Sequence, residues 1–368
     1  MTESRQIVMS GMRPTGRLHL GNYWGALRNW VGLQRRYQCC FCVADWHMFT
    51  TGYEEPGMLQ ENVREMVLDW LAAGLDPESC VIFQQSRVPE HAELALLLSM
   101  ITPISWLENN PTYKEQLQDL AKTKLGKALE EQAGLPSKKM REKIAGEPLE
   151  PVEPDPEKSR LELRTHGFLG YPVLQTADIV LYGAHWVPVG QDQVAHVEIA
   201  REIVRRFNSI YGEVLAEPEA MLTPSAKVPG TDSRKMSKSY GNSVELLETE
   251  QTLQQKVMSM YTDPLKVRAA DQGHPDGCVV FAMHRLYSPH ADNREAECRD
   301  GAIGCVACKK DLLRSMAEPF AEFRRARERF AGAGLAESVL EAGSRKAREV
   351  AGRTLERVRR AMNLRPRI

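Results

Sequence analysis

Two separated segments of the chain carry residues suited to handling the phosphates of a nucleotide such as ATP. The first is residues 14–22, PTGRLHLGN, and the second is residues 235–239, KMSKS. Glycines let backbone amides approach phosphate oxygens, a helix N-terminus adds partial positive charge, and lysines supply mobile charges. Neither segment is a common glycine-rich phosphate loop, and each alone is typical of an ordinary loop. Their occurrence together, in this order, is far rarer and indicates nucleotide chemistry.

The two segments suit one type of reaction, an in-line attack at the α-phosphate that releases pyrophosphate. His19 can donate a hydrogen bond to an oxygen that gains charge in the transition state. Lys235 and Lys238 can stabilise the leaving pyrophosphate from a flexible loop. Such a reaction depends on positioning and electrostatics, so the sequence does not need to supply a nucleophilic side chain.

Strands and helices alternate around these segments. Apolar strands are predicted at residues 6–11, 38–45, 80–83 and 186–189, and helices at residues 21–34, 60–74, 91–101 and from about 194 to 207. The alternation predicts an α/β fold, a Rossmann-like doubly wound parallel sheet with helices on both faces. Ligands of such sheets bind at the carboxyl ends of the strands, where Arg13 and His47 fall.

The remaining chain predicts two further regions. Residues 122–163 are rich in Lys, Glu and Pro and predict an insertion that begins as a helix and ends as a loop. From residue 246 the pattern is helical, with amphipathic helices at 312–330 and 344–362. We therefore expect a catalytic domain at 1–245 and a helical domain at 246–368. No apolar run reaches the length of a membrane span, so we expect a cytoplasmic protein without a membrane partner.

Charge is balanced overall but uneven along the chain. The net charge is -1, yet from Lys309 to the end there are 16 Lys or Arg against 8 Asp or Glu. This asymmetry fits contact with nucleic-acid phosphates. Charge alone fits solvated helix faces at least as well.

The paired segments resemble the HIGH and KMSKS signatures of class I aminoacyl-tRNA synthetases. Further segments, including GNYWGAL at 21–27, YPVLQTAD at 171–178 and VPVGQDQVAHVE at 187–198, make the chain most similar to the tryptophanyl-tRNA synthetase family. The similarity covers nearly the whole chain. It implies activation of L-tryptophan by ATP with Mg²⁺, followed by transfer of the acyl group to tRNA(Trp).

The resemblance also assigns roles around ATP. Thr15, His19 and Asn22 would act on its phosphates and ribose, and Lys235 and Lys238 would hold the pyrophosphate. Asn22 replaces the second histidine of the general class I signature, as is usual in this family. Further ATP contacts would come from Arg13, Gly21, Gly190, Asp192 and Ser237.

The amino-acid pocket separates tryptophan from tyrosine. The chain has a Tyr-x-x-x-Gln-x-x-Asp pattern that archaeal tyrosyl-tRNA synthetases share, but the position that would pair a phenol hydroxyl is the apolar Met9. An indole N–H needs only one acceptor, and Asp178 is the candidate. The resemblance implies a tryptophan pocket made of Met9, His47, Tyr171, Gln175, Asp178, Val187, Val189 and Gln193. Without it, Asp178 is more simply a helix-start carboxylate and His47 a strand-end histidine.

Four late cysteines have the spacing of a metal site. Cys278, Cys298, Cys305 and Cys308 give C-x₁₉-C-x₆-C-x₂-C. Four thiolates can bind Zn²⁺ or a [4Fe–4S] cluster, and spacing alone favours zinc. The resemblance favours the cluster, because some bacterial members of the family carry a similar pattern, although with a slightly longer first gap. Cys278 is therefore the least secure ligand.

The resemblance implies a homodimer and an anticodon-binding C-terminal domain. Two alternatives stay open beside the tryptophan enzyme. One is a tyrosyl-tRNA synthetase, and the other is a non-charging paralogue that serves a binding or regulatory role on the same scaffold.

Overall fold

The structure is a computed structural model of the chain. It describes residues 5–53, 56–111, 113–114, 165–222, 228–332 and 334–364. The predicted insertion at 122–163 lies outside the described residues.

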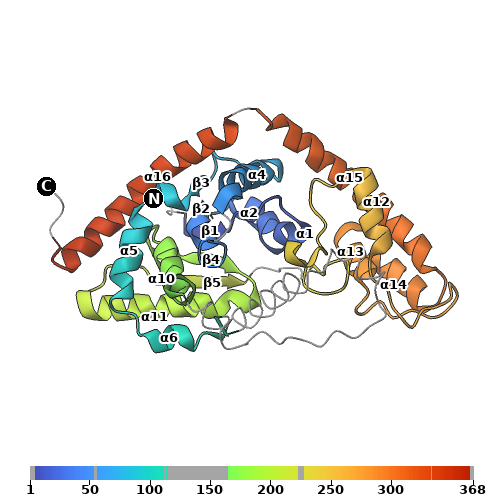
Figure 1. Cartoon of the computed structure of the whole chain (residues 1–368), viewed down its shortest axis with the longest axis horizontal. Helices are drawn as coiled ribbons and strands as arrows, with labels where there is room; N and C mark the ends of the chain where they lie inside the picture. The colour runs from blue at the N-terminus through green and yellow to red at the C-terminus, as the bar shows by residue number, and fades with distance from the viewer. Residues whose placement is uncertain are drawn as a thin grey trace, which may run out of the picture.

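A five-stranded parallel sheet lies at the centre of the fold (Figure 1). Its strands are β1 (Ile7–Met12), β2 (Gln38–Val43), β3 (Val81–Gln84), β4 (Trp186–Val189) and β5 (Glu219–Leu222), and they run in the order β3-β2-β1-β4-β5. Every pairing is parallel. The strands β2, β3 and β4 are largely buried, as expected for a parallel sheet that helices cover on both faces. The order reverses direction next to β1, so this edge of the sheet is a topological switch point where ligands bind.

Helices connect the strands and cover both faces of the sheet. They are α1 (Leu20–Asn22), a π-helical turn (Tyr23–Leu27), α2 (Arg28–Leu33), α3 (Asp45–Met48), α4 (Leu59–Ala72), α5 (Glu90–Ser99), α6 (Ile104–Glu108), α10 (His166–Val180) and α11 (Val194–Tyr211). On one face Trp30 stacks on Phe41 with ring centroids 4.8 Å apart. These rings, together with the fully buried Trp70, anchor the N-terminal helices to the sheet.

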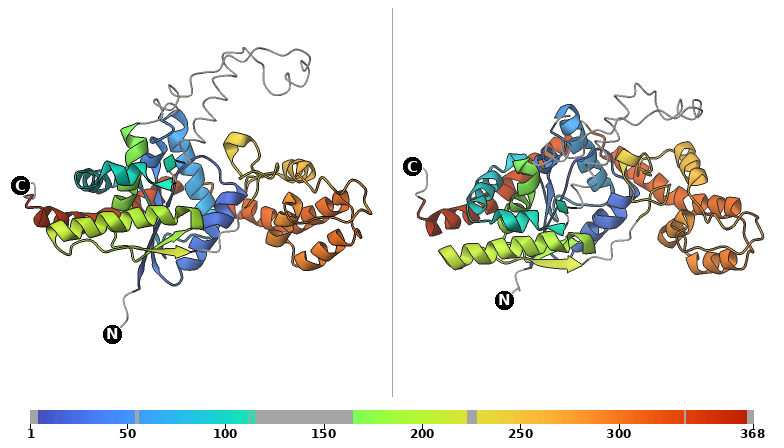
Figure 2. Two further views of the ribbon diagram at one scale, coloured as in Figure 1. Left: turned by 90° about the horizontal axis from the view of Figure 1, so that it is seen from below. Right: turned by 60° about the horizontal axis from the view of Figure 1, so that its bottom comes forward.

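The C-terminal region is helical, as predicted. It contains α12 (Glu250–Ser259), α13 (Val279–Tyr287), α14 (Ala291–Arg299), α15 (Cys305–Arg329) and α16 (Leu335–Ala361). In Figure 1 the two long helices α15 and α16 descend to either side of a common apex. Figure 2 shows the orange helices α13 to α15 extending away from the sheet.

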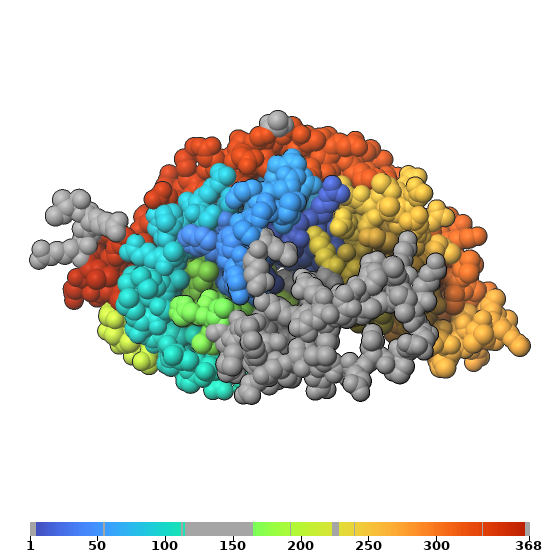
Figure 3. Space-filling model, in the orientation of Figure 1, coloured from blue at the N-terminus to red at the C-terminus, as the bar shows by residue number. Residues whose placement is uncertain are grey.

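Helix α16 returns to the sheet and covers its outer strand β3. Gly343 allows the close approach, because a Cβ atom there would lie 1.8 Å from the carbonyl oxygen of Ile82. The neighbouring Ser344 Oγ accepts the backbone N–H of Gln84 at 3.3 Å. A helix therefore satisfies a donor at what would otherwise be an open strand edge. The red surface of α16 lies along the upper rim in Figure 3.

In the part of the chain that the structure describes, the predicted elements are confirmed with four differences. The helices predicted from 312 and 344 begin seven and nine residues earlier, as α15 and α16. The second strand ends at Val43, because the polar run that follows forms α3. The predicted helix at 21–34 contains a π-helical turn, and β5 was not predicted at all. Within the described residues no helix has the length and apolar character needed to cross a membrane. The domain boundary at 245 stays a prediction.

Candidate active site

His19 is the N-cap of α1 and forms a reciprocal cap with Asn22. The Nδ1 atom of His19 accepts the backbone N–H of Asn22 at 3.3 Å, while Asn22 Oδ1 accepts the N–H of His19 at 3.1 Å. Each side chain thus gives an acceptor to a backbone N–H at the helix start, and the N–H of Asn22 also donates to the carbonyl oxygen of His19 at 2.9 Å. Gly21 permits this geometry, since a Cβ there would lie 2.9 Å from His19 Cε1. The cap explains physically why Asn22 suits this position.

The cap also fixes which nitrogen of His19 carries the proton. Burial, together with the nearby positive charge of Lys238, lowers the pKa of His19 from 6.5 to about 4. The ring is therefore neutral at pH 7, and because Nδ1 accepts, the hydrogen resides on Nε2. Nε2 is therefore the donor nitrogen of His19, as the predicted contact with a phosphate oxygen requires.

This pKa shift makes the stability contribution of His19 depend on pH. Between pH 6.5 and about 4 the folded histidine binds fewer protons than the unfolded one. Its contribution is therefore fully present above pH 6.5 and is lost as the pH falls toward 4. We expect the difference in unfolding free energy between wild type and His19→Gln to be larger at pH 7 than at pH 4.5. Denaturant titrations at both pH values measure it, and a pH-independent difference would contradict this expectation.

The two signatures lie against each other despite their separation in sequence. Lys238 Nζ donates to the carbonyl oxygen of Thr15 at 2.9 Å. Gly16, with a φ of 94°, makes room, because a Cβ there would lie 3.0 Å from Lys238 Nζ. The N–H of Leu20 donates to the carbonyl oxygen of Val244, and the N–H of Leu246 donates to the carbonyl oxygen of Leu18, both at 2.9 Å. A short antiparallel contact therefore joins the first signature to the segment that follows the second.

Asn242 organises the second signature, a role that the sequence did not suggest. Its side chain is 2% exposed and accepts the N–H of Ser237 at 2.8 Å. The same side chain donates to Asp232 Oδ1 at 2.7 Å and to the carbonyl oxygen of Lys235 at 3.1 Å. One amide thus holds three points of the loop. Its signal in the sequence was only an asparagine shortly after the lysines.

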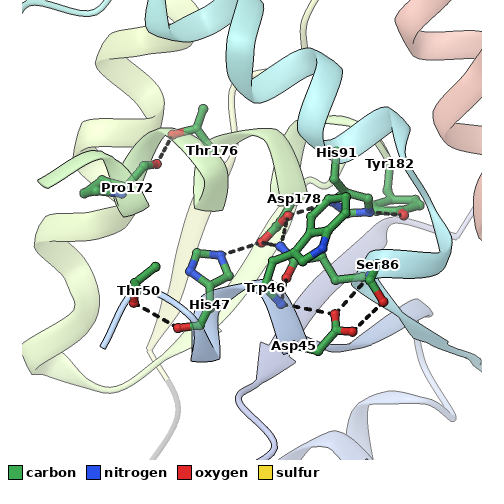
Figure 4. Close-up of polar contacts among 11 residues, drawn as sticks. Asp45, Trp46, His47, Thr50, Ser86, His91, Pro172, Thr176, Asp178 and Tyr182 are labelled. Atoms are coloured by element: carbon green, nitrogen blue, oxygen red, sulfur yellow. Dashed lines mark hydrogen bonds and ion pairs between the residues drawn. The ribbon is translucent and has the colours of Figure 1, made fainter. Parts of the chain in front are cut away.

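Asp178 is the centre of a buried polar network (Figure 4). Its carboxylate is 6% exposed and accepts from His47 Nε2 at 2.9 Å and His91 Nδ1 at 2.6 Å. Gln85 Nε2 donates to both of its oxygens, at 2.8 and 3.0 Å. Burial alone would raise the pKa of Asp178, but the bonds from His47 and His91 outweigh it and hold the pKa well below its usual range. The network keeps an ionised acceptor inside the fold.

His91 and Gln85 were missed as site residues. Both are fully buried, and Nε2 of His91 lies 2.7 Å from the hydroxyl of Tyr182. His91 therefore joins the carboxylate of Asp178 to the hydroxyl of Tyr182, one ring nitrogen facing each. Gln85 directly follows β3 at the carboxyl edge of the sheet, and this position was the signal that could have identified it.

A second polar chain lies on α10 and α11. The hydroxyl of Tyr171 lies 2.5 Å from His196 Nε2, and His196 Nδ1 lies 2.9 Å from Gln193 Oε1. The Gln193 oxygen can only accept, so Nδ1 donates and Nε2 accepts from Tyr171. Burial raises the pKa of Tyr171, which keeps that hydroxyl protonated. Gln175 is half-buried on the same helix, one turn before Asp178.

The apolar residues that were predicted to line the tryptophan pocket also lie in one cluster. Met9, Val187 and Val189 are 2%, 4% and 9% exposed and belong to one buried cluster on the side of the sheet that α10 covers. They come from the adjacent strands β1 and β4. Met9 is thus buried among apolar side chains, and its place in a tryptophan pocket stays a prediction.

The other predicted residues lie at the same edge of the sheet. Arg13 follows β1 and is exposed, and its Nη1 lies 3.4 Å from Thr51 Oγ1. Gly190 is the N-cap of a short 3₁₀ helix, Gln191–Gln193. The backbone of Asp192 belongs to that helix, but its side chain lies outside the described residues. Lys235 is exposed and pairs with Pro229 in an isolated antiparallel bridge.

The four late cysteines line one pocket away from the sheet. Its empty volume is about 390 Å³, including a part open to solvent, and Lys266 and Arg294 also line it. Cys278 is the N-cap of α13, Cys298 lies on α14, and Cys305 and Cys308 lie at the start of α15. Among the described residues, however, no group of three or more His, Cys, Asp or Glu side chains could hold a metal ion as they stand. The ligand set therefore stays a prediction.

Two features together define a class I aminoacyl-tRNA synthetase. One is a parallel sheet with a topological switch point, and the other is a capped His-Leu-Gly-Asn segment in contact with the loop that carries Lys238. The family of tRNA synthetases of class I for tryptophan and tyrosine matches residues 1–130 and 156–321. Tryptophan–tRNA ligases of Aquifex aeolicus and Thermotoga maritima are 47% and 45% identical, each over 97% of this chain and 99% of their own length. The chain therefore belongs to the tryptophanyl-tRNA synthetase family.

Solved structures agree with this membership. The tryptophanyl-tRNA synthetase of Campylobacter jejuni, complexed with ADP and tryptophan, superposes with a TM-score of 0.76 and 29% identity. The alignment covers 98% of this chain and all of that one. A tyrosyl-tRNA synthetase of Archaeoglobus fulgidus has a TM-score of 0.59 at 15% identity, which is a likeness of fold alone.

Proposed function

We propose that the chain activates L-tryptophan with ATP, forming tryptophanyl-adenylate and pyrophosphate, and then transfers the tryptophanyl group to tRNA(Trp). It is a tryptophan–tRNA ligase. The observation that carries the choice of amino acid is the ionised, buried Asp178 beside an apolar wall that includes Met9. An indole N–H is a donor with no acceptor capacity, so a carboxylate satisfies it. A phenol would need a different set of partners.

The first step needs no side-chain nucleophile. The tryptophan carboxylate attacks the α-phosphorus of ATP, the bond to the β-phosphate oxygen breaks, and pyrophosphate leaves. His19 Nε2–H donates to a phosphate oxygen that gains charge, while Lys235 and Lys238 neutralise the pyrophosphate. Mg²⁺ accompanies the ATP. Thr15, Asn22, Arg13, Gly21 and Ser237 complete this side of the site.

The remaining predicted residues orient the substrates. Gly190 and Asp192 line the ribose, and Tyr171, Gln175 and Gln193 surround the amino group. His47 and Asp178 lie beside the indole ring. In the second step a terminal ribose hydroxyl of the tRNA attacks the activated carbonyl, and AMP leaves. The catalytic gain in both steps comes from orientation and fixed charges.

An amino-acid-dependent ATP–pyrophosphate exchange assay tests this function. Tryptophan should support exchange and tyrosine should not. Exchange with tyrosine instead would favour the tyrosine enzyme. A protein that forms the adenylate but does not acylate tRNA(Trp) transcript would be a non-charging paralogue.

The four late cysteines are proposed to hold a [4Fe–4S] cluster, with Zn²⁺ as the alternative. Support comes from the convergence of all four thiols on one pocket, and from Lys266 and Arg294 beside it, which can offset thiolate charge. Such a group would supply structural order where α13, α14 and α15 meet.

Changing Cys305 and Cys308 together to serine tests this site. We expect the variant to lose its bound iron or zinc and to fall at least about tenfold in tRNA charging, while exchange changes less because the pocket lies away from the sheet. Iron and zinc are measured on anaerobically purified protein. The matched control is Cys39→Ser, a cysteine of the buried core. Retention of all metal and all charging would exclude the site.

The partners follow from the family. We propose a cytoplasmic homodimer whose C-terminal helices contact the anticodon. The excess of Lys and Arg after Lys309 supports nucleic-acid contact in that region.

A further inference from the structure

A buried ion pair connects the C-terminal helix α15 to the first signature by way of α4. Arg327 on α15 is 9% exposed and donates from Nε to Asp69 Oδ1 at 3.0 Å. Asp69 on α4 is fully buried, and its Oδ2 accepts the backbone N–H of Leu18 at 3.0 Å. Leu18 directly precedes His19. Two hydrogen bonds through one carboxylate therefore join a C-terminal side chain to the backbone of the ATP site.

The same arginine reaches the first signature by a second route. Arg327 Nη2 lies 3.1 Å from Glu65 Oε1, one turn before Asp69 on α4. Glu65 Oε2 lies 3.4 Å from Arg17 Nε. The Arg17 side chain is 55% exposed, so this second connection contributes little. The buried route through Asp69 carries the coupling.

Helix α15 also holds the segment that follows the second signature. Arg324, one turn before Arg327, donates from Nη1 to the carbonyl oxygen of Glu248 at 2.7 Å. The carbonyl of Leu18 accepts the N–H of Leu246. Both backbone groups of Leu18 are thus hydrogen-bonded. Its N–H donates to Asp69, and its carbonyl oxygen accepts from Leu246 in the segment that follows the second signature. Helix α15 therefore supports the backbone of Leu18 in two ways, through Arg327 and Asp69 and through Arg324 and the segment that contains Leu246 and Glu248.

Packing alone does not explain a charged pair at this place. Taking two charges out of water is costly, and apolar residues of similar volume would serve a core equally well or better. Only the carboxylate gives the buried N–H of Leu18 an acceptor, and only Arg327 on the other side keeps that carboxylate compensated. The pair therefore supplies a hydrogen-bond acceptor to the backbone of the first signature, which an apolar core would not supply.

We propose that Asp69 and Arg327 are positioning residues that set the register of the first signature, and hence of His19, against the phosphates of ATP. This role rests on the proposed function of the site. It makes α15 a part of the ATP-binding machinery although none of the residues assigned to ATP above lies on α15. Tryptophan binding at Asp178, on α10, does not involve the pair.

The test compares Arg327→Met, Arg327→Lys and the apolar double variant Asp69→Leu with Arg327→Met. Each is assayed by tryptophan-dependent exchange with either substrate varied, and each is titrated with ATP directly. We expect Arg327→Met and the double variant to weaken ATP binding and raise the KM for ATP by about ten- to hundredfold, about 1.4–2.7 kcal/mol, with the KM for tryptophan unchanged. Arg327→Lys should be intermediate, since an ammonium keeps one bond to Asp69.

Two further arms separate positioning from folding. The double variant should melt above Arg327→Met and below wild type, because it removes both charges together but leaves the N–H of Leu18 without its acceptor. Arg359→Met is the matched control, because Arg359 joins α16 to Glu93 of α5 at 2.7 Å without touching either signature, and it should leave the KM for ATP unchanged. Wild-type ATP affinity in the double variant would overturn the proposal, and so would a loss shared equally by both substrates. Failure of tryptophan to support exchange in wild type would instead count against the proposed function, while the ATP titrations still decide the positioning role.

Discussion

Replacing Asp178 by alanine is expected to lower kcat/KM for tryptophan by roughly a hundred- to a thousandfold, about 3–4 kcal/mol. The variant loses the acceptor proposed for the indole N–H and leaves the donors of His47, His91 and Gln85 without their shared carboxylate. Unpaired buried polar groups are costly, and they would also disorder the wall of the pocket. The KM for ATP should change little, because His19 and Lys238 do not contact this network. Exchange kinetics with each substrate varied in turn measure the split.

Thr176→Val is the matched control for Asp178→Ala. Thr176 is fully buried on the same helix, and its hydroxyl donates to the carbonyl oxygen of Pro172 at 2.7 Å (Figure 4). Removing that bond tests whether any lost hydrogen bond in α10 weakens tryptophan binding. We expect unchanged KM values for both substrates. An Asp178→Ala enzyme that lost equally on ATP and tryptophan would show that Asp178 only stabilises the fold.

Gly343→Val is expected to prevent α16 from docking and to destabilise the protein by more than ~3 kcal/mol, enough to populate a partly unfolded state. Even the Cβ of alanine would lie 1.8 Å from the carbonyl oxygen of Ile82, and a strand backbone in the sheet cannot move aside as a flexible side chain can. Displacing α16 would also separate Ser344 from the N–H of Gln84. Thermal and urea unfolding measure the loss.

Gly352→Ala, in the same helix, is the opposite case. Apart from its chain neighbours and the backbone of its own helix, no described atom lies within 4 Å of the position of its Cβ, so alanine should stabilise the helix by roughly 0.5–1 kcal/mol. Comparing the two variants therefore separates the effect of helix propensity on stability from the effect of the close contact between α16 and β3. A Gly343→Val protein as stable as wild type would mean that α16 does not dock on β3 as described.

The sheet and its helices could be predicted because their periodicity is local. The apolar strand at residues 186–189 and the helix that follows it occur where the pattern places them. β5 could not be predicted, because Glu219–Leu222 is a short edge strand that lies partly exposed and shows no apolar run. Its strand state comes from pairing with β4, which is a tertiary contact.

The candidate site residues also differ in whether a local pattern marks them. His19, Lys238 and Asp178 could be predicted because each belongs to a motif with a resemblance to a family. Asp69, His91 and Arg327 could not, since each acts through a partner 51 to 258 residues away. A buried aspartate in an amphipathic helix such as α4 is the one local signal, because a charge on an apolar face requires a partner.

The order in which the chain is made gives α16 one more significance. A ribosome releases β3 long before the helix that covers its edge, because that helix comes from residues 335–361. Until then the nascent protein carries an uncovered strand edge, the kind of surface on which neighbouring chains add and aggregate. Messages truncated before the codons of α16 should therefore yield insoluble products rather than weakened enzymes.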